Sequence, residues 1–168
     1  MNMRRAVIGA GAAMTLALGG CVIAAIPSTT TVTRNAPMLV TQAGRDSAAR
    51  EIAVMMQASA MAWNRGDLDA FVNYYEPDTT TTYIGRSGVI RGRAAIRAVY
   101  APRFAPGGMR DSLSFENTEI DLLAPGIANV ISWYRLTRGD STTGHGPTSL
   151  VMRRDADGQW RIVHDHSS

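Results

Sequence analysis

The sequence predicts an α+β domain in which a curved antiparallel sheet wraps around helices. Between residues 46 and 104, apolar residues recur mostly at helical spacing, interrupted by one short hairpin. After residue 112, alternating segments rich in β-branched and aromatic residues are separated by turn sequences such as Pro125-Gly126. This order, helices first and long strands afterwards, is typical of one α+β domain without internal repeats.

The apolar periodicity predicts three helices, over residues 46–65, 68–76 and 93–104. Asp46 or Ser47 can cap the first helix, and Gly66 can end it. Asp67 can cap the second helix, which Pro77 stops. All three helices are expected to bury one apolar face against the sheet.

The strands are predicted from β-branched runs and alternation, over residues 78–85, 112–124, 127–138, 147–154 and 160–168, with a short returning strand after a turn at Gly88. Residues 139–146, "GDSTTGHG", are rich in Gly, Ser and Thr and are expected to form a loop.

The N-terminal residues 1–20 are predicted to be a signal peptide. A basic start is followed by an uncharged apolar run that is too short and too rich in Gly and Ala to span a bilayer well. The motif "LGGC", ending at Cys21, resembles the lipobox of bacterial lipoproteins, in which the cysteine is lipidated and becomes the mature N-terminus. Cys21 is also the only cysteine, so no internal disulfide is possible. An ordinary secreted protein with a stray cysteine is the alternative.

A lipid on Cys21 would place the protein in the bacterial cell envelope, anchored to a membrane. Val22 and Ile23 follow where an acidic residue often signals inner-membrane retention, so an outer-membrane anchor facing the periplasm is expected. Residues 21–45 are rich in Thr, Pro and Ala and are predicted to be the lipidated cysteine and a flexible tether. The folded domain is expected over residues 46–168.

The charge of the chain does not favour nucleic-acid binding. The 17 basic residues are all arginine, and without Arg4 and Arg5 in the signal peptide 15 remain against 14 acidic residues. The closest candidate for a concentrated basic stripe is spread over a predicted hairpin and a helix, and is better explained as solvated surface: Arg86, Arg91, Arg93, Arg97 and Arg103.

Three segments in order, "GDLDAF", "IRGRAAI" and "GQWRIVHDH", resemble the nuclear transport factor 2-like superfamily, and more closely its small bacterial SnoaL-like or ketosteroid-isomerase-like branch. The resemblance covers residues 46–168. It implies a cone-shaped α+β barrel with a cavity between the helices and the concave sheet face, commonly assembled as a homodimer through the sheet. The superfamily includes isomerases, cyclases, hydrolases, dehydratases and association domains, so the fold alone does not predict a reaction.

The functional residues of the known enzymes match poorly. The general-base aspartate of steroid isomerases falls at Tyr83, their oxyanion tyrosine at Ser59 and their partnering acid near Leu150, so the isomerase mechanism is not expected. The epoxide hydrolases of this fold have an arginine and an aspartate two residues apart on a strand. Arg138 and Asp140 have this spacing, but they fall at a strand end.

The association domain of the calmodulin-dependent kinase offers another comparison. Its cavity arginine matches Arg135, and its last strand aligns so that Val163, Asp165 and Ser167 point into the cavity. The resemblance thus implies an Arg135–Asp165 pair inside the cavity. Such a pair could hold the sheet together, and an unpaired arginine could bind an anionic ligand.

Regular alternation in the last strand places His164 and His166 on the face of Trp160 and Ile162, with Asp165 on the opposite face. A Ser-His-Asp triad within this strand would therefore require a bulge. The two histidines lack an evident third ligand, so no metal is predicted. We expect them on a face that packs against a partner subunit. With the opposite phase, His166 would become the best acid–base candidate.

Several aromatic residues fall on faces that should border the cavity, either as core or as the wall of a pocket. With Arg135 and Asp165 they form the predicted ligand-binding set: Trp63, Tyr83, Tyr100, Phe104, Trp133, Arg135 and Asp165. The first hypothesis is a binding protein for a small, partly apolar ligand, without cofactor. An isomerase, cyclase or hydrolase, with Tyr83, Asp165 and His166 as catalytic candidates, is the second. A dimerising association module is the third.

Overall fold

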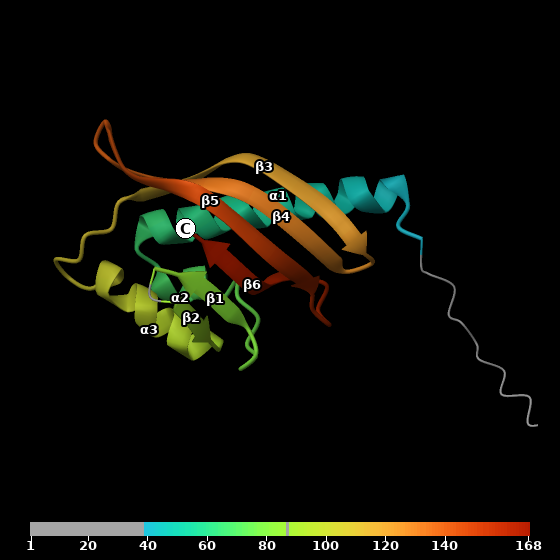
Figure 1. Cartoon of the computed structure of the whole chain (residues 1–168), viewed down its shortest axis with the longest axis horizontal. Helices are drawn as coiled ribbons and strands as arrows, with labels where there is room; N and C mark the ends of the chain where they lie inside the picture. Colours follow the sequence, from blue (N-terminus) through green and yellow to red (C-terminus); the bar gives the residue numbers. More distant parts are fainter. Residues whose placement is uncertain (1–38, 87) are drawn as a thin grey trace, which may run out of the picture. The chain divides into compact units, whose positions relative to one another are not determined.

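The computed structural model describes residues 39–86 and 88–168, which form three helices and a six-stranded sheet (Figure 1). The predicted signal peptide, Cys21 and most of the predicted tether lie outside the described residues. Within the described residues, no helix combines the length and the apolar character needed to cross a membrane.

Helix α1 (Gln42–Arg65) begins earlier than the sequence predicts. The predicted caps were Asp46 and Ser47, but the side chain of Thr41 accepts a hydrogen bond from the backbone N–H of Gly44 at 3.1 Å and caps the helix instead. The last residues assigned to the tether therefore belong to α1. Gly66 ends the helix as predicted, with a φ of 81° that favours glycine.

Helix α2 (Leu68–Val72) is capped by Asp67 as predicted, but it is shorter than expected. The chain after it leaves the helix and runs beside the last strand, where the backbone carbonyl of Tyr74 accepts a hydrogen bond from the backbone N–H of Ile162 at 2.8 Å. This pairing explains the early end of α2, well before Pro77. Helix α3 (Arg93–Phe104) has the predicted bounds.

The strands of the sheet are β1 (Thr82–Gly85), β2 (Gly88–Arg91), β3 (Ser112–Ala124), β4 (Ile127–Arg138), β5 (Ser141–Arg154) and β6 (Trp160–Ser167), in the spatial order β2-β1-β6-β5-β4-β3. All neighbours are antiparallel except β1 and β6, which are parallel. The sheet is thus mixed rather than wholly antiparallel, because β1 joins β6 across the fold and not through a hairpin.

Strand β5 begins at Ser141, so most of the predicted loop at residues 139–146 is strand. Its first half pairs with the end of β4, where Tyr134 faces Gly146 and Thr137 faces Thr142. Pairing with β4 satisfies the backbone of this segment, which overrides the unfavourable strand propensity of its glycines.

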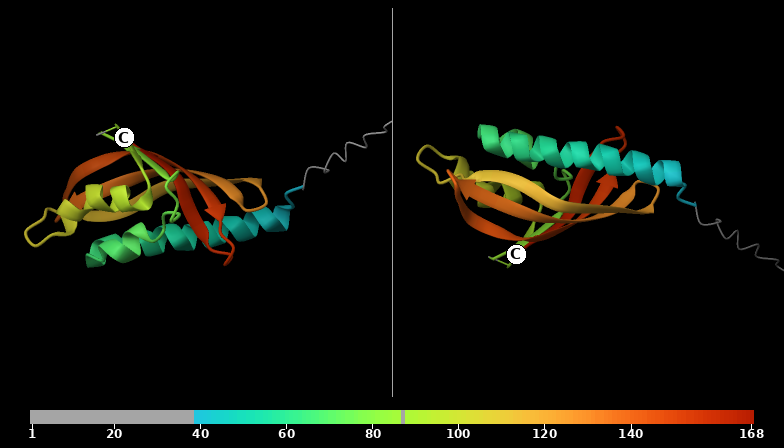
Figure 2. Two further views of the ribbon diagram at one scale, coloured as in Figure 1. Left: turned by 90° about the horizontal axis from the view of Figure 1, so that it is seen from below. Right: turned by 90° about the horizontal axis from the view of Figure 1, so that it is seen from above.

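The core lies between α1 and the inner face of the sheet, and Figure 2 shows the strands bending around this helix. Ile52 on α1, Ile96 on α3, and Val130 and Met152 on the sheet have no exposed surface. Trp63, near the end of α1, is buried and donates its ring N–H to the backbone carbonyl of Asp111 at 2.7 Å. The helices and the sheet thus share one core.

Strand β6 contains a bulge at Val163. Met152 pairs with Ile162 and the next residue, Val151, pairs with His164, so Val163 has no partner on β5. The extra residue puts Ile162 and Asp165 on the same inner face. Asp165 therefore points inward as expected, but the prediction that both histidines share a face with Ile162 is wrong, because it assumed regular alternation.

The contribution of α1 to the core can be measured with two variants. Ile52→Ala should lower the free energy of unfolding by about 2–5 kcal/mol, since the side chain is fully buried and its removal leaves a cavity. Val54→Ala, on the exposed side of the same helix, should change it by about 0.5 kcal/mol or less. Urea denaturation measures both; equal losses would contradict the orientation of α1.

Candidate functional site

A half-enclosed cavity of about 410 Å³ lies between the helices and the inner face of the sheet. Its wall is mainly aromatic and aliphatic, with a few polar groups. The lining side chains are Met56, Trp63, Phe71, Val99, Leu113, Phe115, Leu136, Leu150 and Ile162, the tyrosines Tyr75, Tyr83, Tyr100 and Tyr134, and the polar or charged residues Ser59, Arg86, Arg103, Thr148, Asp165, Ser167 and Ser168.

Four of the predicted ligand-binding residues, Trp63, Tyr83, Tyr100 and Asp165, lie in the wall of this cavity. They come from α1, β1, α3 and β6, and the rings of Tyr83 and Tyr100 are 5.5 Å apart between centroids. Tyr83 and Asp165 are direct neighbours on the parallel strands β1 and β6. The tertiary structure thus gathers residues from segments more than 100 positions apart.

Trp133 and Arg135 do not line the cavity, which corrects the predicted orientation of β4. The inward side chains of this strand are Ser132, Tyr134 and Leu136. Alternation therefore places Trp133 and Arg135 on the outer face of the sheet.

The predicted Arg135–Asp165 pair is not formed. Arg135 donates two hydrogen bonds to Glu116 on the neighbouring strand β3, at 2.5 and 2.9 Å. This bidentate pair gives the guanidinium a partner on the outer face. The pair also lowers the pKa of the Glu116 carboxyl and raises the pKa of Arg135, chiefly through the hydrogen bonding.

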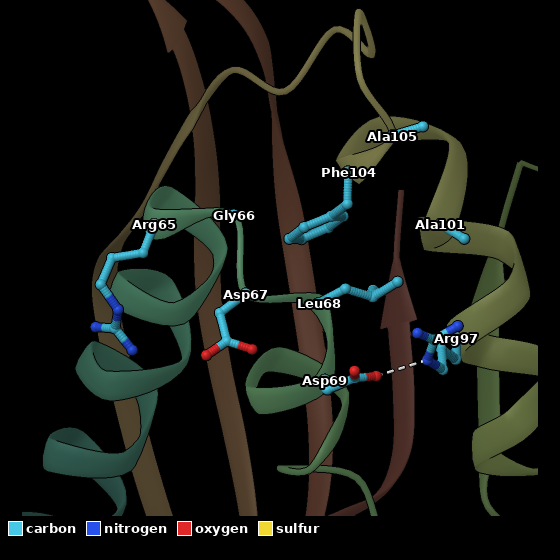
Figure 3. Close-up of a pocket in the computed structure, with 9 residues that line it drawn as sticks. All are labelled: Arg65, Gly66, Asp67, Leu68, Asp69, Arg97, Ala101, Phe104 and Ala105. Carbon is cyan, nitrogen blue, oxygen red and sulfur yellow. Dashed lines mark hydrogen bonds and ion pairs between the residues drawn. The ribbon is translucent and has the colours of Figure 1, made fainter.

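Phe104 lies beside the cavity rather than in its wall. Its ring packs edge-on against Trp63, with 5.1 Å between centroids. Figure 3 shows this ring reaching from α3 toward the turn between α1 and α2, over an open hollow on the outside of the domain. In this hollow Asp69 accepts a hydrogen bond from Arg97 at 2.7 Å, and both side chains are largely exposed. The hollow is therefore a solvated surface.

The histidines lie away from the cavity. The ring of His164 and the side chain of Thr82 are hydrogen-bonded at 2.6 Å, and His166 is exposed. His166 is thus not placed to act on a molecule in the cavity. Arg138 is bound to Asp111 at 2.6 Å and not to Asp140. No group of three potential metal ligands is found within residues 39–86 and 88–168.

Asp165 is 5% exposed and sits in the cavity wall. Its carboxylate accepts hydrogen bonds from the hydroxyl of Tyr75 at 2.6 Å and from the hydroxyl of Ser167 at 2.7 Å. Burial raises the pKa of Asp165 above its ordinary range, while these hydrogen bonds and the nearby His164 oppose the rise. A carboxyl in this state can hold or release a proton closer to neutral pH than an exposed one.

Tyr75 is the contact that sequence reasoning missed. It lies in a segment predicted as helix, 90 positions from Asp165, and no local signal relates the two. Burial and the nearby Asp165 charge raise the pKa of both Tyr75 and Tyr100 well above their ordinary range. Tyr83 and Tyr100 lie beside each other in the same wall, and the hydroxyl of Tyr75 donates directly to the carboxyl of Asp165.

The three positions matched to the steroid isomerases, Ser59, Tyr83 and Leu150, all line the cavity. None of them carries a carboxylate, and the carboxylate of this cavity comes instead from Asp165 on β6. The groups that the steroid isomerase mechanism requires are therefore not present at the matched positions.

The chain matches the SnoaL-like domain family over residues 52–168 and belongs to that family. It is similar to an NTF-2-like protein of unknown function from Shewanella oneidensis MR-1, with 28% identity and a TM-score of 0.66 over 72% of this chain and 98% of that one. No curated protein matches the chain.

Two further structures share the fold. A nuclear transport factor 2-like superfamily protein from Salmonella enterica has 19% identity and a TM-score of 0.60 over 73% of this chain and 91% of that one. A putative ketosteroid isomerase from Parabacteroides distasonis has 23% identity and a TM-score of 0.55 over 70% of this chain and 84% of that one. The cone-shaped α+β fold predicted from the sequence is confirmed.

The raised pKa of Asp165 predicts a pH-dependent stability. The folded protein binds this proton more tightly than the unfolded chain, so the free energy of unfolding should fall as pH rises from about the ordinary value of 3.8 through the raised one. Asp165→Asn should remove this decline and gain stability relative to the wild type across that window. Urea denaturation at a series of pH values measures the effect.

Tyr75→Phe provides the matched comparison. It removes a hydrogen bond that favours the ionised carboxylate, so the pKa of Asp165 should rise further and the decline should extend to higher pH. Parallel stability curves for the wild type and Asp165→Asn would contradict the assignment.

Proposed function

We propose that this domain binds a small, partly apolar molecule in the cavity between the helices and the sheet. The observation that carries the proposal is a half-enclosed cavity with aromatic walls and one buried carboxyl, Asp165. Its volume falls within the range of about 300–1,000 Å³ that is usual for small-molecule sites. A few fixed polar groups in an apolar wall are also the usual composition of such sites.

Asp165 is the group that would orient the ligand. Tyr75 and Ser167 hold its carboxyl in place, so it loses little further freedom when a ligand binds. A ligand hydroxyl could donate to the carboxylate, and a ligand carbonyl could accept from the protonated form. Tyr83 and Tyr100 add hydroxyl groups on the same side of the cavity.

The binding proposal can be tested with 2-naphthol and naphthalene as probes in titration calorimetry. The wild-type protein should bind both, and Asp165→Asn should weaken the binding of 2-naphthol by about tenfold, because the charged acceptor of the hydroxyl is replaced by the neutral amide oxygen of Asn. Naphthalene lacks the hydroxyl, so its affinity should not change.

A variant whose new side chain fills the cavity provides a second test of the binding proposal. Leu113→Trp places a large ring in the cavity from a buried position on β3 and should abolish binding of both probes. Leu123→Trp, at an exposed position on β3 outside the cavity, is the matched control and should bind like the wild type. If neither probe bound the wild type saturably, the proposal would be wrong.

A second candidate function is acid–base catalysis in the same cavity, of the isomerase, cyclase or hydrolase type. The observation that favours it is the raised pKa of a buried carboxyl that is hydrogen-bonded to a tyrosine. Asp165 would transfer the proton, and Tyr83 or Tyr100 would donate a hydrogen bond to developing charge on the substrate.

Turnover distinguishes the two candidates. For a substrate found in a screen of small hydroxylated or carbonyl compounds, Asp165→Asn should lower kcat by at least about a hundredfold while the substrate still binds. The kcat of the wild type should rise with pH through the pKa of Asp165 if the carboxylate is the base. Equal kcat in Asp165→Asn and the wild type would contradict this role.

Two expectations from the sequence stay predictions. The first is a lipid anchor at Cys21 in the cell envelope, facing the periplasm from the outer membrane. The second is a homodimer through the outer face of the sheet, where Ile131 is 38% exposed beside Trp133 and the Arg135–Glu116 pair. Neither is needed for binding in the cavity, which is formed within one chain.

A further inference from the structure

Two arginines stand at the mouth of the cavity, Arg103 in the last turn of α3 and Arg86 in the turn between β1 and β2. Both are exposed and both belong to the cavity wall. Within the described part of the chain, neither has an acidic partner within 4.0 Å, whereas seven other arginines do. Ser168 also reaches this rim, but its backbone oxygen accepts a hydrogen bond from Tyr134 and makes no ion pair with either arginine.

The position of Arg103 is defined by its neighbours. Its guanidinium carbon lies 5.9 Å from the centroid of the Trp63 ring, so it contacts the aromatic wall. Asp111, whose pKa the charge of Arg103 helps to lower, is already hydrogen-bonded to Arg138 and Thr143, each at 2.6 Å. The donors of Arg103 are therefore available to a molecule that enters the cavity.

The acidic and basic groups of the cavity thus lie at opposite ends of it. The buried end holds Asp165, which is satisfied by Tyr75 and Ser167, and the exposed end holds two positive groups. Between them the wall is aromatic. Arginine binds carboxylates in a planar, bidentate arrangement, and this geometry favours a carboxylate over a neutral polar group.

We propose that the ligand is a small carboxylate with an apolar ring, whose ring lies against Trp63 and Tyr100 and whose carboxylate binds Arg103 and Arg86 at the mouth. This inference rests on the proposed function, because it names the class of ligand for the same cavity. The inference also gives the orientation of the ligand: its carboxylate faces the solvent and its ring lies deeper in the cavity.

The test compares 2-naphthoate with its neutral amide, 2-naphthamide, by titration calorimetry on the full chain. The two probes share ring and shape and differ in charge. The wild type should bind 2-naphthoate about tenfold more tightly than 2-naphthamide. This ratio of affinities should decrease as the salt concentration rises. Arg103→Gln should lower the affinity for 2-naphthoate by about tenfold and leave the affinity for 2-naphthamide unchanged. Arg86→Gln should change the two affinities in the same direction.

Arg97→Gln is the matched control. It lies on the same helix and carries the same charge, but its guanidinium pairs with Asp69 in the outer hollow. It should bind both probes like the wild type. An equal loss in Arg97→Gln and Arg103→Gln would overturn the inference, since the effect would then be one of net charge.

The outcomes separate the two proposals. If 2-naphthol binds with the expected dependence on Asp165 while the wild type binds 2-naphthamide as tightly as 2-naphthoate, the cavity function stands and the carboxylate inference is wrong. If none of the three probes binds the wild type, both are wrong.

Discussion

The bulge at Val163 is the constraint on which both the core and the candidate site depend. Without the extra residue, strict alternation would turn either Ile162 or Asp165 to the outer face of the sheet. With it, Ile162 closes the core below the cavity and Asp165 enters the cavity wall from the same strand. The hydrogen bond from Tyr75 to Asp165 then joins the segment after α2 to β6. A local irregularity of the backbone therefore supplies Asp165, the one buried carboxyl among the described residues that line the cavity.

The two faces of the sheet differ in how their charged groups are paired, and this difference sets the electrostatics of the cavity. On the outer face Arg135 is paired with Glu116, and His164 is hydrogen-bonded to Thr82. On the inner face, Asp165 is held by neutral hydroxyl groups rather than by a cation. A buried carboxyl without a paired cation has a raised pKa, and this is the property that makes the cavity suitable for orienting a polar group of a ligand or for moving a proton.

Membership in the SnoaL-like family accounts for the fold of this chain, but it does not account for the residues found at the matched functional positions. The fold is shared with structures that include a putative ketosteroid isomerase. The residues matched to the isomerase base, donor and partnering acid are Tyr83, Ser59 and Leu150, and none of them carries a carboxylate. The fold by itself therefore does not define the function, and the buried carboxyl of this cavity comes from β6.

The sequence by itself determined the α+β class and the position of α3 and of the long strands. It also assigned Trp63, Tyr83, Tyr100 and Asp165 to the cavity, but together with Phe104, Trp133 and Arg135, which do not line it. These results depend on periodicity and on ordered motifs, which are local properties of the chain. It could not determine the start of α1 or the extension of β5, since both depend on partners that compete with local propensity.

Only the tertiary structure decided the orientation of Arg135, the bulge in β6 and the contact between Tyr75 and Asp165. The physical reason is the same in each case. An acidic residue on a neighbouring strand, a register shift between two strands and a hydroxyl group 90 positions away are properties of pairs of segments, and no single segment encodes them.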